Sequence, residues 1–172
     1  MVFGGDKMKT VLVRGPLLSK SGYGEHSRQV LRYLLEKPGL KVETQVLPWG
    51  ITPWKIDPED PDVKSILSRT SNMDRKYDLS FQIQLPNEWD PSLAIKNIGV
   101  TASVETDICN PEWTLTHTNK MDKVIVPSVH AKKNLGGNSV SSIKNISVVP
   151  ESFFDEINED CDPIDLDLKS DF

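Results

Sequence analysis

Two short segments of the chain carry residue types that suit chemistry. The first, Ser21-Gly22-Tyr23-Gly24, brings two glycines to a predicted helix start. Backbone N–H groups in the first turn of a helix have no partner inside the helix and lie at the positive end of its dipole. Gly22, Tyr23 and Gly24 are therefore predicted to bind a phosphate or a carboxylate, with a tight turn that binds nothing as the alternative.

The second segment is Glu105-Thr106-Asp107, which follows the apolar run 98–104. A carboxylate and a hydroxyl at a strand end can orient a sugar hydroxyl, act as a base or stabilise an oxocarbenium-like state. Ligands of open α/β sheets bind beyond the carboxyl ends of the strands. We therefore predict Glu105 as a catalytic residue and Thr106 and Asp107 as substrate-binding residues. A helix cap or a turn is the alternative role for Asp107.

Trp113 and Ser128 complete the predicted substrate-binding residues. The ring of a Trp offers a flat apolar platform for a sugar, but packing in the core is an equal alternative for both Trp113 and Trp89. Ser128 stands where a predicted strand passes into a predicted helix. Capping of that helix is the alternative role for its hydroxyl.

The composition predicts one globular domain. The 172 residues are 37% hydrophobic and 26% charged, and the formal net charge of −5 argues against nucleic acid as a partner. No apolar run approaches the roughly 20 residues that span a bilayer, and the N-terminus does not have the pattern of a signal peptide. We therefore expect a soluble, cytoplasmic protein without a transmembrane segment.

The cysteines and histidines do not follow a metal-binding pattern. Cys109 and Cys161 have no companion thiols nearby in the sequence, so we expect two free cysteines in a reducing compartment, with a disulfide between them as the alternative. The three histidines are not spaced as ligands with these cysteines. No metal site is predicted.

Strands and helices are predicted to alternate along the chain. Strands are expected at 10–14, 41–47, 77–85, 97–105, 123–127 and 147–150, and helices at 24–37, 62–73, 112–121 and 129–135. This succession indicates the α/β class, with a doubly wound, mostly parallel, Rossmann-like sheet. The Pro-rich segment 48–61 is predicted to wrap over the surface as a loop, and the acidic segment 155–172 to be a linker or a disordered tail.

Several of these segments together resemble the N-terminal half of family 4 glycosyltransferases. The resemblance covers about Lys9 to Phe154. It rests on the glycine loop after the first strand, the Glu-Thr-Asp turn, Trp113, Met121-Asp122, the run Val-Ile-Val-Pro-Ser-Val-His-Ala-Lys that ends at Lys132, and the run Val-Val-Pro-Glu that ends at Glu151. It is strongest at 98–132 and 148–151.

The resemblance implies an acceptor-side Rossmann-like domain, residues 9–154, of a GT-B glycosyltransferase. Such an enzyme transfers a sugar with retention from a nucleotide-sugar donor to a saccharide or another hydroxyl acceptor, with no cofactor and no essential metal. The amides of Gly22, Tyr23 and Gly24 would then bind the donor diphosphate. Glu105 occupies the place where the family often has a His, which leaves the identity of the acceptor open.

We expect the donor-binding domain to be absent from this chain, so that the chain alone has little or no activity. A separate donor-domain chain or a second copy of this chain is the expected protein partner. The spacing of Glu151 and Glu159 matches a donor-site motif of the family but is attributed to chance, because it lies in the predicted linker. The alternative function is a non-catalytic glycan- or anion-binding module. A dinucleotide oxidoreductase is disfavoured, since the loop lacks a third glycine and a ribose-binding acid.

Overall fold

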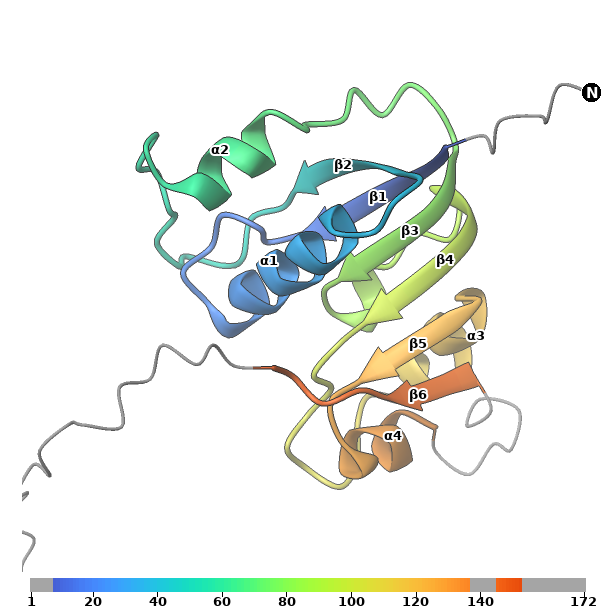
Figure 1. Ribbon diagram of the computed structural model, residues 1–172. Helices are drawn as coiled ribbons and strands as arrows, with labels where there is room; N and C mark the ends of the chain where they lie inside the picture. The colour runs from blue at the N-terminus through green and yellow to red at the C-terminus, as the bar shows by residue number, and fades with distance from the viewer. Residues whose placement is uncertain (1–7, 137–144, 153–172) are drawn as a thin grey trace, which may run out of the picture.

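The fold is an α/β, Rossmann-like, doubly wound sheet, seen in a computed structural model that describes residues 8–136 and 145–152 (Figure 1). Six parallel strands lie in the order β2-β1-β3-β4-β5-β6. The strands are β1 Lys9–Gly15, β2 Leu40–Val46, β3 Tyr77–Ile83, β4 Ala94–Val100, β5 Lys123–Val126 and β6 Ile146–Val148. All of their carboxyl ends therefore lie along one edge of the sheet, where ligands of such folds bind.

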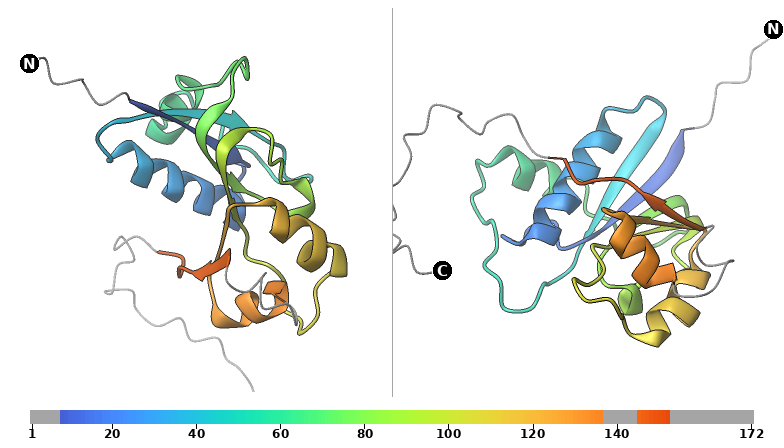
Figure 2. Two further views of the ribbon diagram at one scale, coloured as in Figure 1. Left: turned by 90° about the vertical axis from the view of Figure 1, so that its right-hand side faces the viewer. Right: turned by 90° about the horizontal axis from the view of Figure 1, so that it is seen from below.

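Helical segments cover both faces of this sheet (Figure 2). They are α1 Gly22–Leu35, α2 Pro61–Leu67, the 3₁₀ turn η1 Pro86–Glu88, the π-helical turn η2 Trp113–His117, α3 Thr118–Lys120 and α4 Val129–Gly136. In the described part of the chain, no helix is both long and apolar enough to span a membrane.

The two faces have separate hydrophobic clusters because side chains alternate along each strand. Val11 and Val13 of β1 pack with Leu31 of α1 and Ile66 of α2 on one face. A second cluster, called the β5–β6 cluster below, joins strands β5 and β6 to α4 and to Trp89. Its buried members are Trp89, Cys109, Met121, Val124, Val126, Ala131, Leu135 and Ile146.

A single residue extends the sheet beyond β2. Thr70 forms a parallel bridge with Thr44, whose N–H donates to Arg69 O at 2.8 Å and whose C=O accepts from Ser71 N at 2.8 Å. If Thr70 is counted as a strand of one residue, it is the third strand along the chain, and the sheet then follows the Rossmann order. The helix predicted at 62–73 ends at Leu67 because the chain must extend to make this bridge.

On the opposite face, a loop and an aromatic ring take the place of a helix between β3 and β4. Trp89 is 6% exposed, and its Nε1 donates to Gln82 O at 3.1 Å. A Cβ on Gly99 would lie 2.6 Å from the Trp89 ring, so only glycine fits there. The buried amide of Gln82 also donates to Asp90 O at 2.7 Å. Trp89 is therefore a core residue, which settles its two alternatives in favour of packing.

The strand predicted at 97–105 is shifted in the structure, since β4 ends at Val100. Thr101 N still donates to Ile125 O of β5, at 3.1 Å. The next amide, Ala102 N, donates instead to the hydroxyl of Tyr23 at 3.0 Å, and Ser103 adopts a positive φ of 66°. The chain therefore leaves the sheet before it reaches Glu105.

Candidate functional site

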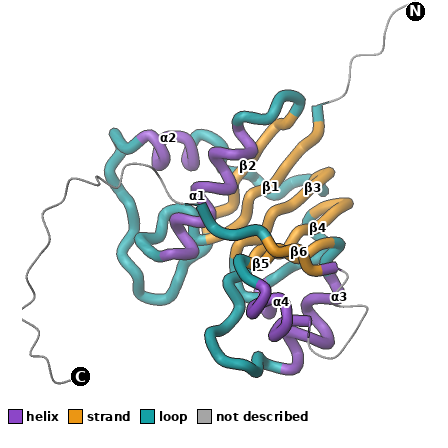
Figure 3. The backbone as a smooth tube through the Cα atoms, turned by 60° about the horizontal axis from the view of Figure 1, so that its bottom comes forward, coloured by secondary structure: helices purple, strands orange, loops and turns teal. Residues whose placement is uncertain are grey.

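The glycine loop between β1 and α1 lies at the carboxyl edge of the sheet (Figure 3). Ser21 caps α1, because its Oγ accepts from Gly24 N at 3.1 Å. The first intrahelical bond runs from Glu25 N to Ser21 O at 2.9 Å. The N–H groups of Gly22 and Tyr23 precede that bond, so they have no acceptor within the helix and can bind an anion.

The two glycines of the loop have different surroundings. A Cβ on Gly24 would lie 2.0 Å from the backbone oxygen of Ser19, which no side chain can tolerate. No atom lies within 4 Å of the corresponding position on Gly22. Gly24 is therefore required for packing, whereas Gly22 leaves an open approach to the helix N-terminus.

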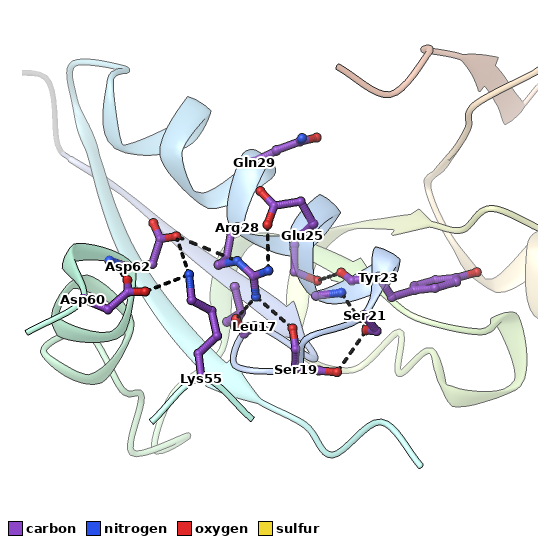
Figure 4. A network of polar contacts seen from close by, with 12 residues as sticks. Leu17, Ser19, Ser21, Tyr23, Glu25, Arg28, Gln29, Lys55, Asp60 and Asp62 are labelled. Carbon is purple, nitrogen blue, oxygen red and sulfur yellow. Dashed lines mark hydrogen bonds and ion pairs between the residues drawn. The ribbon is translucent and has the colours of Figure 1, made fainter. Parts of the chain in front are cut away.

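A buried arginine holds the loop in this shape (Figure 4). Arg28 is 4% exposed, and its Nη1 donates to Leu17 O at 2.8 Å and to Ser19 O at 2.9 Å. Its Nη2 donates to Glu25 Oε2 at 2.7 Å. Arg28 was not predicted from the sequence, although its position three residues before Leu31, on the apolar face of α1, was a usable signal.

The Pro-rich loop 48–61 supports the glycine loop from outside. Lys20 N donates to Pro53 O at 2.8 Å, and Lys55 N donates to Leu18 O at 2.7 Å. The Nζ of Lys55 pairs with Asp60 Oδ2 at 2.8 Å (Figure 4). This hydrogen bond from Lys55 is the main cause that lowers the pKa of Asp60. Part of the Pro-rich loop therefore holds the glycine loop in place through backbone hydrogen bonds.

Tyr23 connects the glycine loop to β4. Its ring stacks on Trp49 with 4.3 Å between ring centroids, and its hydroxyl lies 2.9 Å from Thr101 Oγ1. Ala102 N donates to the same hydroxyl. Burial is the main cause that raises the pKa of Tyr23, so the phenol keeps its proton at neutral pH. The ends of β1 and β4 are therefore joined through one side chain.

A small cavity opens where these elements meet. Its lining residues are Gly22, Tyr23, His26, Ala102 and Glu151, and its volume is about 120 Å³. His26 Nδ1 lies 3.1 Å from Glu151 Oε1. Two unbonded helix amides and an imidazole suit an oxyanion of the size of a phosphate. A whole nucleotide-sugar needs more room, since small-molecule sites usually measure about 300 Å³ or more.

Glu105, Thr106 and Asp107 lie on the same edge of the sheet but do not line this cavity. All three are exposed, in the loop that follows β4. Thr106 Oγ1 donates to Ile108 O at 3.0 Å, and Thr106 O accepts from the side-chain amide of Asn134. The structure therefore brings Gly22 and Tyr23 together with His26 rather than with Glu105, and the catalytic role of Glu105 stays a prediction.

The other two predicted substrate-binding residues make structural contacts. Trp113 is half-buried and packs against the β5–β6 cluster. Ser128 Oγ accepts from Ala131 N at 3.1 Å and so caps α4. These contacts are the alternatives of core packing and capping, and neither residue lines the cavity.

Comparisons of the chain with protein-family models, with curated proteins and with solved structures find no match.

The described residues also bear on the metal and cysteine predictions. Within 8–136 and 145–152, no group of three or more His, Cys, Asp or Glu side chains is arranged to hold a metal ion. Cys109 is a free, buried thiol whose Sγ lies 3.2 Å from Asn134 O. Cys161, Glu159 and the predicted tail 155–172 lie outside the described residues.

Proposed function

We propose that this chain is the acceptor-side domain of a retaining glycosyltransferase that uses a nucleotide-sugar donor. The observation that carries the proposal is the cavity at the start of α1, which Gly22, Tyr23 and His26 line together. The Rossmann-like sheet supports it, as does the resemblance of the glycine loop, the Glu-Thr-Asp turn and the Val-Val-Pro-Glu segment to family 4 glycosyltransferases.

In this proposal, the cavity takes one phosphate of the donor diphosphate. Negative charge grows on the diphosphate as the bond to the sugar breaks, and fixed N–H donors stabilise that charge without reorganisation. The imidazole of His26 adds a hydrogen-bond donor. Glu105, on the same edge of the sheet, faces the acceptor or the transferred sugar. A donor-binding domain, wherever it is encoded, supplies the rest of the nucleotide-sugar site.

A second candidate is a non-catalytic module that binds an anion or a glycan. The size of the cavity favours this candidate, because about 120 Å³ accommodates a phosphate-sized group but not a nucleotide-sugar. The two candidates share the anion site and differ in whether sugar transfer follows.

Binding is tested first, by following backbone amide signals in NMR during titration with pyrophosphate, UDP-glucose and GDP-mannose. We expect the signals of Gly22, Tyr23 and His26 to shift with all three probes and not with uridine, which has no phosphate. A response elsewhere on the molecule, or none, would refute the anion site. Both candidate functions would then lose their main support.

Transfer is tested next, with the chain fused to the donor domain of a family 4 glycosyltransferase and assayed on an array of oligosaccharide acceptors. We expect transfer to some acceptors, and we expect Glu105→Gln to lower kcat at least tenfold with little loss of stability. A fusion that binds donor and glycans but transfers nothing would leave the binding module as the function. Full activity of Glu105→Gln would refute the role of Glu105 alone.

A further inference from the structure

The segment 149–152 crosses the carboxyl edge of the sheet from β6 to α1, and is called the strap below (Figure 1). At one end, Val149 N donates to Val126 O at 2.9 Å, which continues the pairing of β6 with β5. At the other end, Ser152 O accepts from the side-chain amide of Gln29 on α1, at 2.9 Å. Between these two anchors, the strap carries Glu151 over the cavity.

Glu151 lines the cavity in which the anion site is proposed. It forms one wall of the cavity together with Gly22 and Tyr23, and its Oε1 is 3.1 Å from His26 Nδ1. Its charge also acts on Tyr23: burial is the main cause that raises the pKa of the phenol, and Glu151 adds to the increase. The carboxylate of Glu151 therefore sits beside the imidazole of His26, in the same cavity as Gly22 and Tyr23.

We infer that Glu151 competes with a bound anion, because it forms a negative wall of the cavity and holds His26, and that the carboxylate turns away when a phosphate binds. This inference rests on the anion site of the proposed function and adds a means of regulation to it. A carboxylate and a phosphate carry the same sign of charge, so a phosphate that enters the cavity lined by Glu151 is repelled by it. The strap thus makes an autoinhibitory contact.

The contacts of the strap suit a group that can leave. The Glu151 side chain is 45% exposed, so its contact with His26 is open to water. Beyond Val149, the hydrogen bond from Gln29 and this contact hold the described part of the strap to α1. A ligand that binds only the open form has its affinity reduced by the fraction of molecules that are closed.

An opposite role for Glu151 gives an opposite result. A carboxylate in a sugar site accepts hydrogen bonds from sugar hydroxyls, so its removal weakens binding. Removal of an internal competitor strengthens binding. The sign of the change in affinity on Glu151→Gln therefore separates the two roles.

The experiment measures the Kd of pyrophosphate for the wild-type chain, Glu151→Gln and Glu36→Gln by isothermal titration calorimetry. Glu36 caps the other end of α1 and is exposed, so its variant removes an equal charge from the same helix without touching the cavity. We expect Glu151→Gln to bind about three- to tenfold more tightly and Glu36→Gln to bind like the wild type. Equal or weaker binding by Glu151→Gln would overturn the inference.

Amide NMR of the same samples shows whether the strap moves. On addition of pyrophosphate to the wild type, the signals of Glu151 and Ser152 should shift along with those of Gly22 and Tyr23. If Gly22 and Tyr23 respond while Glu151→Gln has an unchanged Kd, the anion site stands and the inference falls. If neither the wild type nor Glu151→Gln binds pyrophosphate, the anion site and the inference both fall.

Discussion

The two glycines that open α1 offer a matched pair of substitutions at the residue scale. Gly24→Ala should lower the free energy of unfolding by about 2–3 kcal/mol, because its Cβ would meet the backbone oxygen of Ser19, which cannot rotate away. Gly22→Ala should change it by less than about 1 kcal/mol, since its Cβ would point into open space. Urea denaturation followed by Trp fluorescence measures both. Equal stabilities would show that the loop relaxes around a methyl group at Gly24.

Tyr23 should contribute through its hydroxyl as well as through its ring. Tyr23→Phe keeps the stack on Trp49 but removes the partner of Thr101 Oγ1 and of Ala102 N. We expect a loss of about 1–2 kcal/mol in unfolding free energy and faster hydrogen exchange at the Ala102 amide. Tyr33→Phe is the control, because Tyr33 is 59% exposed. An unchanged exchange rate at Ala102 would mean that water replaces the hydroxyl without cost.

At the scale of elements, Arg28 links α1 to the glycine loop and thereby shapes the site. Arg28→Lys should destabilise the chain by about 2–3 kcal/mol, because one ammonium group on a shorter side chain cannot serve both Leu17 O and Ser19 O together with Glu25. It should also weaken pyrophosphate binding. Arg69→Lys is the control, since the Arg69 side chain donates to the nearby Ser65 and Ser68 and lies away from the glycine loop. Thermal unfolding and calorimetry test the two effects.

Asp122 ties the start of β5 to β4 and should give a pH-dependent stability. Its carboxylate pairs with Lys96 Nζ at 2.7 Å and accepts from Asn97 N at 2.9 Å. The hydrogen bond from Lys96 is the main cause that lowers the pKa of Asp122 in the folded chain, and the hydrogen bond from Asn97 N lowers it further. Because the pKa of Asp122 is lower in the folded chain than in the unfolded chain, the carboxylate stabilises the fold at pH values above the unfolded-state pKa of about 3.9. This stabilisation is lost as the pH falls through the folded-state pKa.

Asp122→Asn should therefore be less stable than the wild type by about 1 kcal/mol at pH 6, a small figure because the side chain is 35% exposed. The difference should shrink as the pH falls below about 4. Urea denaturation between pH 3 and about pH 7 measures it. Asp107→Asn, on the exposed loop, should change stability little across the range. A difference that stays constant with pH would contradict the ionic role of Asp122.

Most elements could be predicted from periodicity, since the buried strands and α1 carry strong local patterns. The predicted ends of helices and strands are wrong where a tertiary contact determines them. Thr70 leaves the predicted helix to bridge Thr44, and Ala102 leaves the predicted strand to bond Tyr23. The site was predicted in part for the same reason. The glycine loop has a local sequence pattern, whereas the contact between His26 and Glu151 joins residues far apart in the chain and leaves no local pattern.

For the molecule as a whole, the strand pairing suggests two units of different stability. β1 is paired along its whole length with β2 and is buried on both faces, whereas β4 and β5 pair only over 98–100 and 123–125. Local opening takes less free energy where fewer contacts must break. We expect the amides of β5 and β6 to exchange through a local opening whose free energy is about 1–3 kcal/mol lower than that of the opening that exposes β1.

Native-state hydrogen exchange on a matched pair of variants tests this expectation. Ile66 is fully buried in the cluster around β1, and Ile146 is 1% exposed in the β5–β6 cluster. Ile66→Val should lower the opening free energy of the Val11 amide by about 1 kcal/mol. It should leave that of the Val124 amide unchanged, because the contacts of Ile66 stay intact when only β5 and β6 open. Ile146→Val should lower both, since both openings break its contacts. If Ile66→Val lowers both equally, the sheet unfolds as one unit, and the strap that follows β6 cannot open with its own half of the molecule.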